Sequence, residues 1–271
     1  MTEPEPPPTE GFRMSKSRSA LELGVMVGIV ATLLGFSVWI VRHAVDLTIG
    51  QVPVAVDRTL GEQVSKALGA TATQCTNPAA LDYVQKVAAP LLASLEDKRF
   101  SFQFVVSASE DVNAFALPGG YVTVNYGLLK AAESGDEVAA VLAHELQHVL
   151  QRHGTRRILR DMGSSVLLSA LFGGTDFLVP ASVAQNLTNS AYDRDQERES
   201  DARGLELMTR AGIDPRGMSR FFERLAKTSP SLPTLLSTHP DPGDRAAKAA
   251  AAAGAHPGTR ALPSPKGVPC K

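Results

Sequence analysis

The chain has 271 residues, 44% of them hydrophobic and 20% charged, which is enough for one domain of ordinary size with additional terminal segments. Its 27 basic and 28 acidic residues give a formal net charge of −1, so no overall positive field would attract nucleic acid. Two cysteines exclude a disulfide-dense scaffold and a zinc module built from four cysteines.

The N-terminal segment predicts a disordered tail followed by a membrane-spanning helix. Residues 1–20 begin with an acidic, proline-rich stretch that cannot bury a core. Residues 23–41 are nineteen residues without a charge, which at 1.5 Å per residue can cross a hydrocarbon core of about 30 Å. We therefore predict a transmembrane signal anchor over residues 21–42. The alternative is a cleaved signal peptide, which is disfavoured because the apolar stretch is long and no A-x-A-like site follows it.

The flanking charges predict the orientation of this anchor. Arg13, Lys16 and Arg18 precede the apolar stretch, whereas Arg42 alone follows closely. By the positive-inside rule the N-terminus is cytoplasmic, which in a bacterium describes a single-pass inner-membrane protein with a periplasmic domain.

Two cysteines would then lie in an oxidising compartment. A disulfide between Cys75 and Cys270 is possible there, and two unrelated thiols are the alternative that the sequence leaves open.

The segments before residue 130 predict helices and then strands. Residues 51–95 have a helical pattern interrupted at 69–78. Residues 100–106 alternate and are rich in aromatic and β-branched side chains, which favours a strand. Residues 113–125 indicate a turn and a second strand around a Pro-Gly-Gly sequence at 118–120.

Longer helices are predicted beyond these strands. A helix over residues 134–153 should begin at a capping box of Ser134 and Glu137 and end at Gly154, and its interior is apolar nearly all round. A second should cover residues 181–210. The sequence gives an α+β class, mostly helical with a small sheet.

The C-terminal part of the chain completes this domain plan. A third long helix should begin at Asp214 and Pro215, which are a good N-cap and first helical residue. We expect the folded domain to cover residues 45–250. Residues 251–271 are rich in proline and glycine and predict a flexible tail.

The central predicted helix carries the sequence His-Glu-Leu-Gln-His. Because His144 and His148 are four residues apart, they stand on one helix face and can place two imidazole nitrogens on one zinc ion. Glu145 would be held beside the metal, where it can accept a proton from water. Coincidence is the alternative, but an apolar helix would then bury three polar groups without partners, which is costly.

A catalytic zinc site also needs a third protein ligand. Glu197 and Asp201 share a face of the second long helix, so one carboxylate can bind the metal while the other orients a ligand histidine. Glu199 should point away from both, and His153 is interpreted as a solvated helix end. An ordinary solvated charged face is the alternative for this acidic run.

These motifs together resemble a known family. The sequences NAFALPGG at 113–120, HELQH at 144–148, ERESD at 197–201 and STHP at 237–240 are similar to those of the membrane-associated zinc metallopeptidases. That group includes HtpX, the CAAX prenyl endopeptidases and the Oma-type mitochondrial protease, and the chain is most similar to compact periplasmic members such as BepA. The resemblance covers about residues 51–245.

The resemblance implies a gluzincin-type HExxH metallopeptidase domain that binds one Zn²⁺. It implies that His144, His148 and Glu197 bind the ion, that Glu145 is the general base and that Asp201 supports a ligand. The family motif usually reads E-x-x-A-D; here a serine at position 200 replaces the alanine, a small-for-small change that we do not expect to disturb the site.

Further residues carry implied roles. Family members also use a histidine in an H-P segment and an arginine six residues later, here His239 and Arg245. Either residue could stabilise an oxyanion, or His239 could occupy the fourth position of the zinc and silence the enzyme. A surface-loop histidine is the alternative.

An edge strand beside the zinc helix binds the substrate backbone in such peptidases, which implies a role for Asn113, Ala114, Phe115 and Ala116. An ordinary hairpin is the alternative.

An apolar segment lies between the two predicted ligand helices. Residues 162–179 are interrupted by polar residues at 173–176, so each piece is too short to cross a membrane. It could form a lid, a surface that dips toward the bilayer, or a packed helix.

The sequence therefore predicts a membrane-anchored zinc metalloendopeptidase that acts on unfolded or misassembled envelope proteins and does not bind nucleic acid. A catalytically silenced, chaperone-like client-binding protein is the alternative. Prenyl-protein processing is disfavoured because the relatives that perform it are polytopic. No helical-repeat segment follows residue 245, so we expect no partner-docking domain of that kind.

Overall fold

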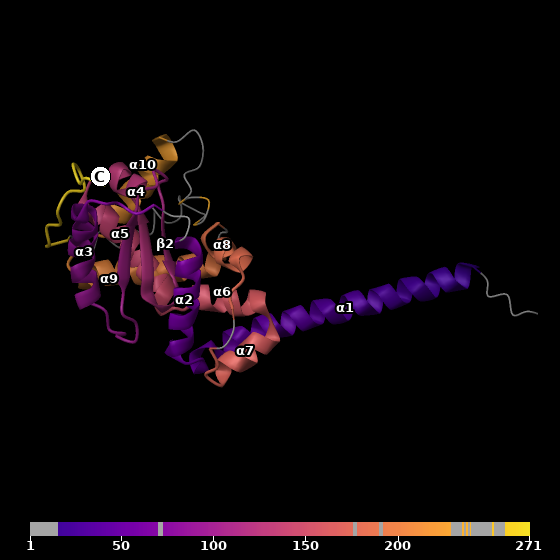
Figure 1. Ribbon diagram of the computed structural model, residues 1–271. Helices are drawn as coiled ribbons and strands as arrows, with labels where there is room; N and C mark the ends of the chain where they lie inside the picture. Colours follow the sequence, from indigo (N-terminus) through magenta and orange to yellow (C-terminus); the bar gives the residue numbers. More distant parts are fainter. Residues whose placement is uncertain are drawn as a thin grey trace, which may run out of the picture. The chain divides into compact units, whose positions relative to one another are not determined.

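The computed structural model describes residues 16–69, 73–175, 178–189 and 192–228, single residues 235, 237, 239 and 251, and residues 258–271. The chain forms two compact units, Met1–Ala44 and Val45–Lys271. The described part is mainly helical with one small sheet, which confirms the predicted α+β class (Figure 1).

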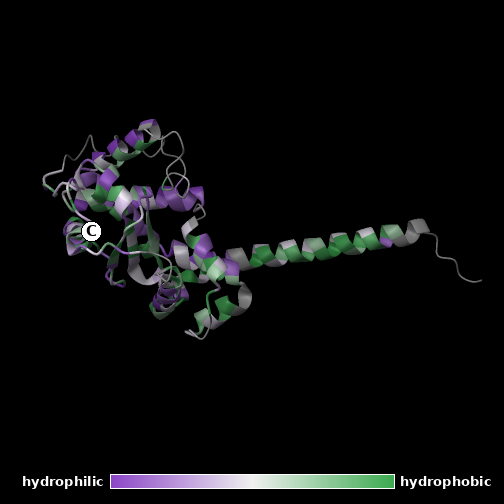
Figure 2. Cartoon of the chain, turned by 45° about the horizontal axis from the view of Figure 1, so that its top comes forward, coloured by the Kyte–Doolittle hydropathy of each residue, from purple (hydrophilic) through white to green (hydrophobic). Residues whose placement is uncertain are grey.

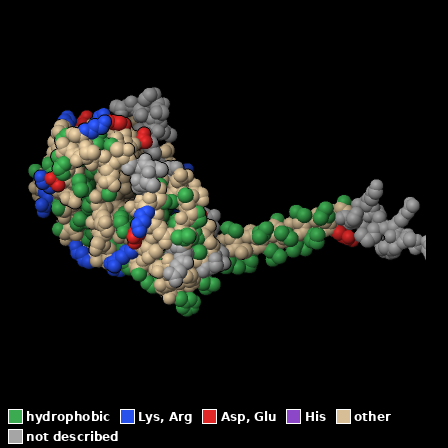
Figure 3. All heavy atoms as spheres, in the orientation of Figure 1, with side chains coloured by type: hydrophobic (Ala, Val, Ile, Leu, Met, Phe, Trp, Pro, Cys, Tyr) green, Lys and Arg blue, Asp and Glu red, His purple; other side chains and the backbone are tan. Residues whose placement is uncertain are grey.

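The first unit consists of most of one helix. Helix α1 covers Lys16–Thr48, and its side chains from 20 to 40 are exposed and mainly apolar (Figures 2 and 3). A window within Ala20–Gln51 has a mean hydropathy of 2.2, so by length and composition this helix can cross a membrane.

The second unit holds the remaining elements. Its 3₁₀ turns are η1 (Ile49–Gln51) and η2 (Pro118–Gly120), and its strands are β1 (Gln103–Ser107), β2 (Ala114–Leu117) and β3 (Tyr121–Asn125). Its helices are α2 (Val54–Gly69), α3 (Pro78–Ala93), α4 (Tyr126–Ala131), α5 (Gly135–Leu150), α6 (His153–Met162), α7 (Ser164–Leu171), α8 (Ala181–Asn189), α9 (Arg194–Arg210) and α10 (Arg216–Thr228).

Helix α5 is the centre of this unit. Every residue from 137 to 150 is buried, as the nearly uniform apolar pattern of this helix predicts. Helices α3, α9 and α10 and strand β2 pack around it (Figure 1). Polar side chains on α5 therefore face protein rather than water.

The sheet has the strand order β1-β3-β2. Strand β1 pairs in parallel with β3, with Gln103 opposite Tyr121, and β2 pairs antiparallel with β3, with Leu117 opposite Tyr121. The region 113–125 therefore contains two strands joined by η2, where we expected a single strand. The close approach of α2 supports the turn, since a Cβ atom on Gly61 would lie only 1.8 Å from the carbonyl oxygen of Pro118.

One predicted helix is divided, and another begins at the predicted N-cap residue but without the predicted capping hydrogen bond. The predicted helix over 181–210 is divided into α8 and α9, and Asp193 caps α9 by accepting a hydrogen bond from the N–H of Gln196 at 2.9 Å. Ser134 precedes α5 but makes no side-chain cap. Glu137 instead accepts a hydrogen bond from the Glu133 N–H and pairs with Arg224.

Residues 258–271 pack on the domain, although their composition predicted a flexible tail. Cys270 is bonded to Cys75, so the disulfide that the sequence left open is present. The hydroxyls of Tyr83 and Tyr126 donate to the carbonyls of Pro263 and Val268 at 3.1 and 2.9 Å. Hydrogen bonds and a covalent link therefore hold this segment, and Leu262 and Val268 also pack against the core.

The end of α5 is shaped by a buried arginine. Arg152 has a left-handed backbone conformation (φ 58°), and α6 begins at once at His153, so the helix restarts where an end at Gly154 was expected. The Arg152 guanidinium donates to both carboxylate oxygens of Asp57, and to the carbonyls of Ile49 and Val52. This buried ion pair holds the restart in place.

Replacing Arg152 by methionine should lower the free energy of unfolding by about 3–5 kcal/mol, because Asp57 would keep a buried charge without its cation. Urea unfolding of the metal-free protein in detergent measures this loss. The matched control is Lys66→Met, which breaks an exposed pair with Glu62 and should change little. Equal losses in the two variants would contradict the structural role given to Arg152.

Candidate metal centre

Two helices bring the polar residues of the centre together. Helices α5 and α9 pack closely at Gly204, where a Cβ atom would lie 3.3 Å from the backbone nitrogen of His144. This approach places Glu197 and Asp201 of α9 beside His144 and His148 of α5. The i, i+4 spacing on each helix then directs both pairs into one space.

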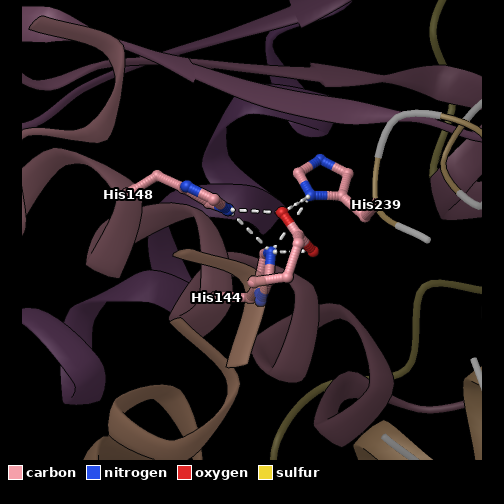
Figure 4. Close-up of side chains that lie close together, drawn as sticks. His144, His148 and His239 are labelled. Atoms are coloured by element: carbon pink, nitrogen blue, oxygen red, sulfur yellow. Dashed lines mark hydrogen bonds and ion pairs between the residues drawn. The ribbon is translucent and has the colours of Figure 1, made fainter. Parts of the chain in front are cut away.

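The side-chain donors converge on a single point (Figure 4). The Nε2 atoms of His144 and His148 lie 2.9 Å apart. The carboxylate oxygens of Glu197 lie 3.3 Å from Nε2 of His148 and 3.5 Å from Nε2 of His144. These residues come from separate parts of the sequence, and all are buried.

His239 contributes a fourth donor and is buried at this centre rather than exposed on a surface loop. Its Nδ1 lies 2.9 Å from Glu197 Oε1 and 3.2 Å from His144 Nε2. Its Nε2 lies 3.5 Å from Glu145 Oε1. The donor atoms of His144, His148, Glu197 and His239 all lie within 4.8 Å of one another.

The chemistry of this donor set fits zinc. Three imidazoles and one carboxylate are nitrogen and oxygen ligands that Zn²⁺ takes in tetrahedral sites. Burial lowers the pKa of His148 well below its usual value and keeps the ring neutral, as a ligand must be. Burial acts to raise the pKa of Glu197, but the adjacent His239 and His144 outweigh it and hold that pKa well below its usual range.

Asp201 lies behind the first histidine. Its Oδ1 is 2.9 Å from Nδ1 of His144, on the side of the ring away from the donor cluster. A carboxylate there favours the tautomer with its proton on Nδ1, which leaves the Nε2 lone pair directed at the cluster. The helical spacing predicted that Glu197 and Asp201 share a face, and the structure places Glu197 at the donor cluster and Asp201 on His144.

His153 lies behind the second histidine and is fully buried, so its interpretation as a solvated helix end is wrong. Its Nδ1 is 3.0 Å from Nδ1 of His148, and its Nε2 is 3.4 Å from Glu199 Oε2. Burial and the nearby Arg156 lower the pKa of His153 to about 4, so it carries one proton at neutral pH. If the proton of His153 is on Nε2, which faces Glu199, its Nδ1 can accept a hydrogen bond from Nδ1–H of His148. The Nε2 lone pair of His148 then faces the donor cluster.

Two more neighbours were missed by the sequence reasoning. The ring of Tyr192 stacks on His148 with centroids 4.1 Å apart, and burial together with the charge of Glu145 raises the pKa of its phenol. The hydroxyl of Ser200, at the position where alanine is usual, lies 3.4 Å from His153 Nδ1. Tyr192 carried no usable signal because it lies just before α9, outside the helical spacing.

The predicted substrate-binding segment lies next to the central helix. Strand β2 packs against α5, with Asn113, Ala114 and Ala116 buried and Phe115 half-buried. Arg245 lies outside the residues that the structure describes.

Replacing His153 by alanine should weaken zinc binding by about 10–100-fold, because His148 loses the contact that fixes its tautomer and ring orientation. Competition with a chromophoric chelator measures the zinc dissociation constant. His43→Ala removes an exposed histidine of α1 and should leave that constant unchanged. A His153→Ala protein that is folded and binds zinc as tightly as the parent would contradict this arrangement.

Known proteins share these features. The sequence model of peptidase family M48 matches residues 78–253. The beta-barrel assembly-enhancing protease of Escherichia coli K12 is 28% identical over 218 residues, which cover 75% of this chain and 44% of that protein. The metalloprotease LoiP of the same strain is 27% identical over 199 residues, 70% of this chain and 77% of that protein.

A mitochondrial protein is also similar. The mitochondrial metalloendopeptidase OMA1 of Arabidopsis thaliana is 35% identical over 144 residues, 52% of this chain and 29% of that protein. This chain spans less than half the length of the beta-barrel assembly-enhancing proteases that it matches. The family model covers well over half of the chain, and all four residues of the buried donor cluster lie within the matched range. The chain therefore belongs to peptidase family M48, the zinc metalloproteases.

Proposed function

We propose that this chain is a membrane-anchored zinc metalloendopeptidase that cleaves unfolded or misassembled envelope proteins. The observation that carries the proposal is the buried convergence of His144, His148 and Glu197, with Glu145 on the same helix turn as the first histidine. His144, His148 and Glu197 would hold the ion. When bound, zinc polarises the scissile carbonyl and makes water more acidic.

Glu145 acts as the general base in this proposal. It accepts a proton from the attacking water as the oxygen–carbon bond forms, and it donates that proton to the amine nitrogen as the carbon–nitrogen bond breaks. Its carboxylate is buried on the face of α5 that carries the histidines, and Oε1 lies 3.5 Å from His239 Nε2. Asp201 keeps His144 in the tautomer that binds metal.

The edge of the sheet offers a place for the substrate backbone. Strand β2 is the last strand in the order β1-β3-β2 and packs on α5, so an extended peptide could add beside it next to the metal. Ala114 and Ala116 are buried in the core, where their small side chains let β2 pack closely on the unit. Asn113 and Phe115 complete the proposed binding segment.

His239 controls access in this proposal. A catalytic zinc keeps one position open, but Nδ1 of His239 lies within the donor cluster and would fill it. Leu235, four residues before His239, donates its N–H to the carbonyl of Val112, two residues before β2. Withdrawal of His239 would open the fourth position of the metal, after which His239 or Arg245 could stabilise the oxyanion.

The same contact favours a second candidate function. If His239 stays on the metal, the chain would be a silenced zinc protein that binds clients without cleaving them. The test below separates the two functions.

The proposed location is the bacterial inner membrane, with the domain in the periplasm. The apolar length of α1 and the cluster of Arg13, Lys16 and Arg18 before it support this orientation. The disulfide between Cys75 and Cys270 suits an oxidising compartment. The name of the Escherichia coli relatives, which refers to beta-barrel assembly, supports envelope proteins as substrates.

Glu145→Gln should reduce cleavage of unfolded casein by at least about 100-fold while zinc remains bound, because an amide cannot accept the proton. The assay uses the full chain in detergent with one equivalent of zinc. Glu206→Gln, at an exposed position of α9, is the matched control and should leave cleavage unchanged. Equal cleavage by the Glu145→Gln protein would exclude this residue as the base.

His239→Ala, assayed in the same way, distinguishes a silenced protein from an active one. Cleavage that appears or rises only in this variant identifies His239 as an inhibitory ligand. Bound zinc without cleavage in any variant favours the client-binding function, and absence of bound zinc contradicts the metal centre itself.

A further inference from the structure

The second unit exposes few large apolar side chains among its described residues. Among its described residues, the large hydrophobic side chains that are exposed are Leu47, Leu168, Phe172 and Leu178, with exposed fractions of 81%, 56%, 89% and 85%. We refer to these four residues as the apolar patch. Such side chains, exposed on a domain that otherwise buries its large apolar groups, mark an interaction surface.

Contacts next to the patch residues lie along the segment from Asp46 to Gln63, which runs from the end of α1 into α2. Arg160, near the end of α6, pairs with Asp46, the neighbour of Leu47. Gly173, which follows Phe172, has its Cβ position 4.0 Å from the side chain of Pro53. Next to Leu178, the Val179 N–H donates to Gln63 of α2 at 2.8 Å.

The views of the molecule agree with these contacts. Helix α7 lies at one margin of the second unit, away from the C-terminus, and apolar side chains are visible over it (Figures 1 and 3). Helix α7 covers Ser164–Leu171 and is far too short to cross a bilayer. A short apolar element of this kind can lie in the interface between head groups and acyl chains.

Chain connectivity identifies what covers the patch. Leu47 follows the last residue of the first unit by three positions, which at 1.5 Å per helical residue is about 5 Å. The predicted anchor ends at residue 42, five residues before Leu47, so a bilayer that contains it ends within about 8 Å of Leu47 along α1. If the lipid did not cover them, the side chains of the apolar patch would face water next to the membrane surface.

We infer that the apolar patch inserts into the outer interface of the bilayer that α1 crosses, so that the domain rests on the lipid through α7 and Phe172. This inference rests on the membrane anchor of the proposed function. Helix α6 begins at His153, behind the metal ligand His148, and ends just before α7. Its ten residues span about 15 Å, so the patch would hold the metal centre close to the membrane surface.

Tryptophan fluorescence in vesicles tests the inference with the full chain. Trp39 is the only tryptophan and lies in α1, so the parent protein reports whether the anchor is inserted. The test variant combines Trp39→Phe with Phe172→Trp. The matched control combines Trp39→Phe with Lys266→Trp, an exposed position near the C-terminus. Each protein is reconstituted in phosphatidylethanolamine and phosphatidylglycerol vesicles, with or without bromine atoms on the acyl chains.

Brominated lipid should remove most of the emission from residue 39 and from residue 172, and none from residue 266. If residue 39 is quenched but residue 172 behaves like residue 266, the anchor stands and the inference is wrong. If residue 39 itself is not quenched, the anchor of the proposed function fails and the inference with it. Quenching by aqueous iodide is measured on the same samples. If the emission from residue 172 is protected from iodide but unchanged by brominated lipid, the patch binds protein, either a second copy or a client, and the inference is also wrong.

Discussion

The structure depends on one electrostatic constraint, the convergence of three imidazoles and one carboxylate where solvent is excluded. Polar groups buried in this way are costly unless each finds a partner, and nitrogen lone pairs directed at one another cannot all share protons. A cation at the centre satisfies every donor at once. Burial keeps His148 neutral, and neutral imidazole is the form that binds metal. The fold therefore prepares the site, and a bound metal would in turn stabilise the fold.

The same constraint organises the contacts outside the cluster. Each of the two α5 histidines has its second ring nitrogen on a partner, His144 on Asp201 and His148 on His153. The second line of contacts continues to Glu199, which is partly exposed and also pairs with Arg203. The buried ring nitrogens of His148 and His153 are thereby linked to the carboxylate of Glu199 near solvent. Because each of these hydrogen bonds fixes the position of a proton, the Nε2 lone pairs of His144 and His148 are both directed at the donor cluster.

Pairs of site residues that lie one turn apart on a single helix could be predicted from the sequence. Contacts between residues that are brought together where the chain changes direction could not. Spacing alone placed His144 with His148 and Glu197 with Asp201, since both pairs are one turn apart. His153 was misread because a left-handed Arg152 restarts the helix, and a non-glycine residue at positive φ gives no local signal. The position of His239 came from family resemblance, because no rule of spacing connects it to α5.

Arg152 links the segment that follows α1 to the contact between His153 and His148. Its backbone turns the chain so that His153 meets His148, and its guanidinium binds the carbonyls of Ile49 and Val52, which follow directly after α1. The geometry behind a metal ligand is therefore held by the segment through which the domain leaves its anchor. Arg152 is buried and its guanidinium donates to four oxygens, so one side chain joins the segment after α1, helix α2 and the turn that brings His153 to His148.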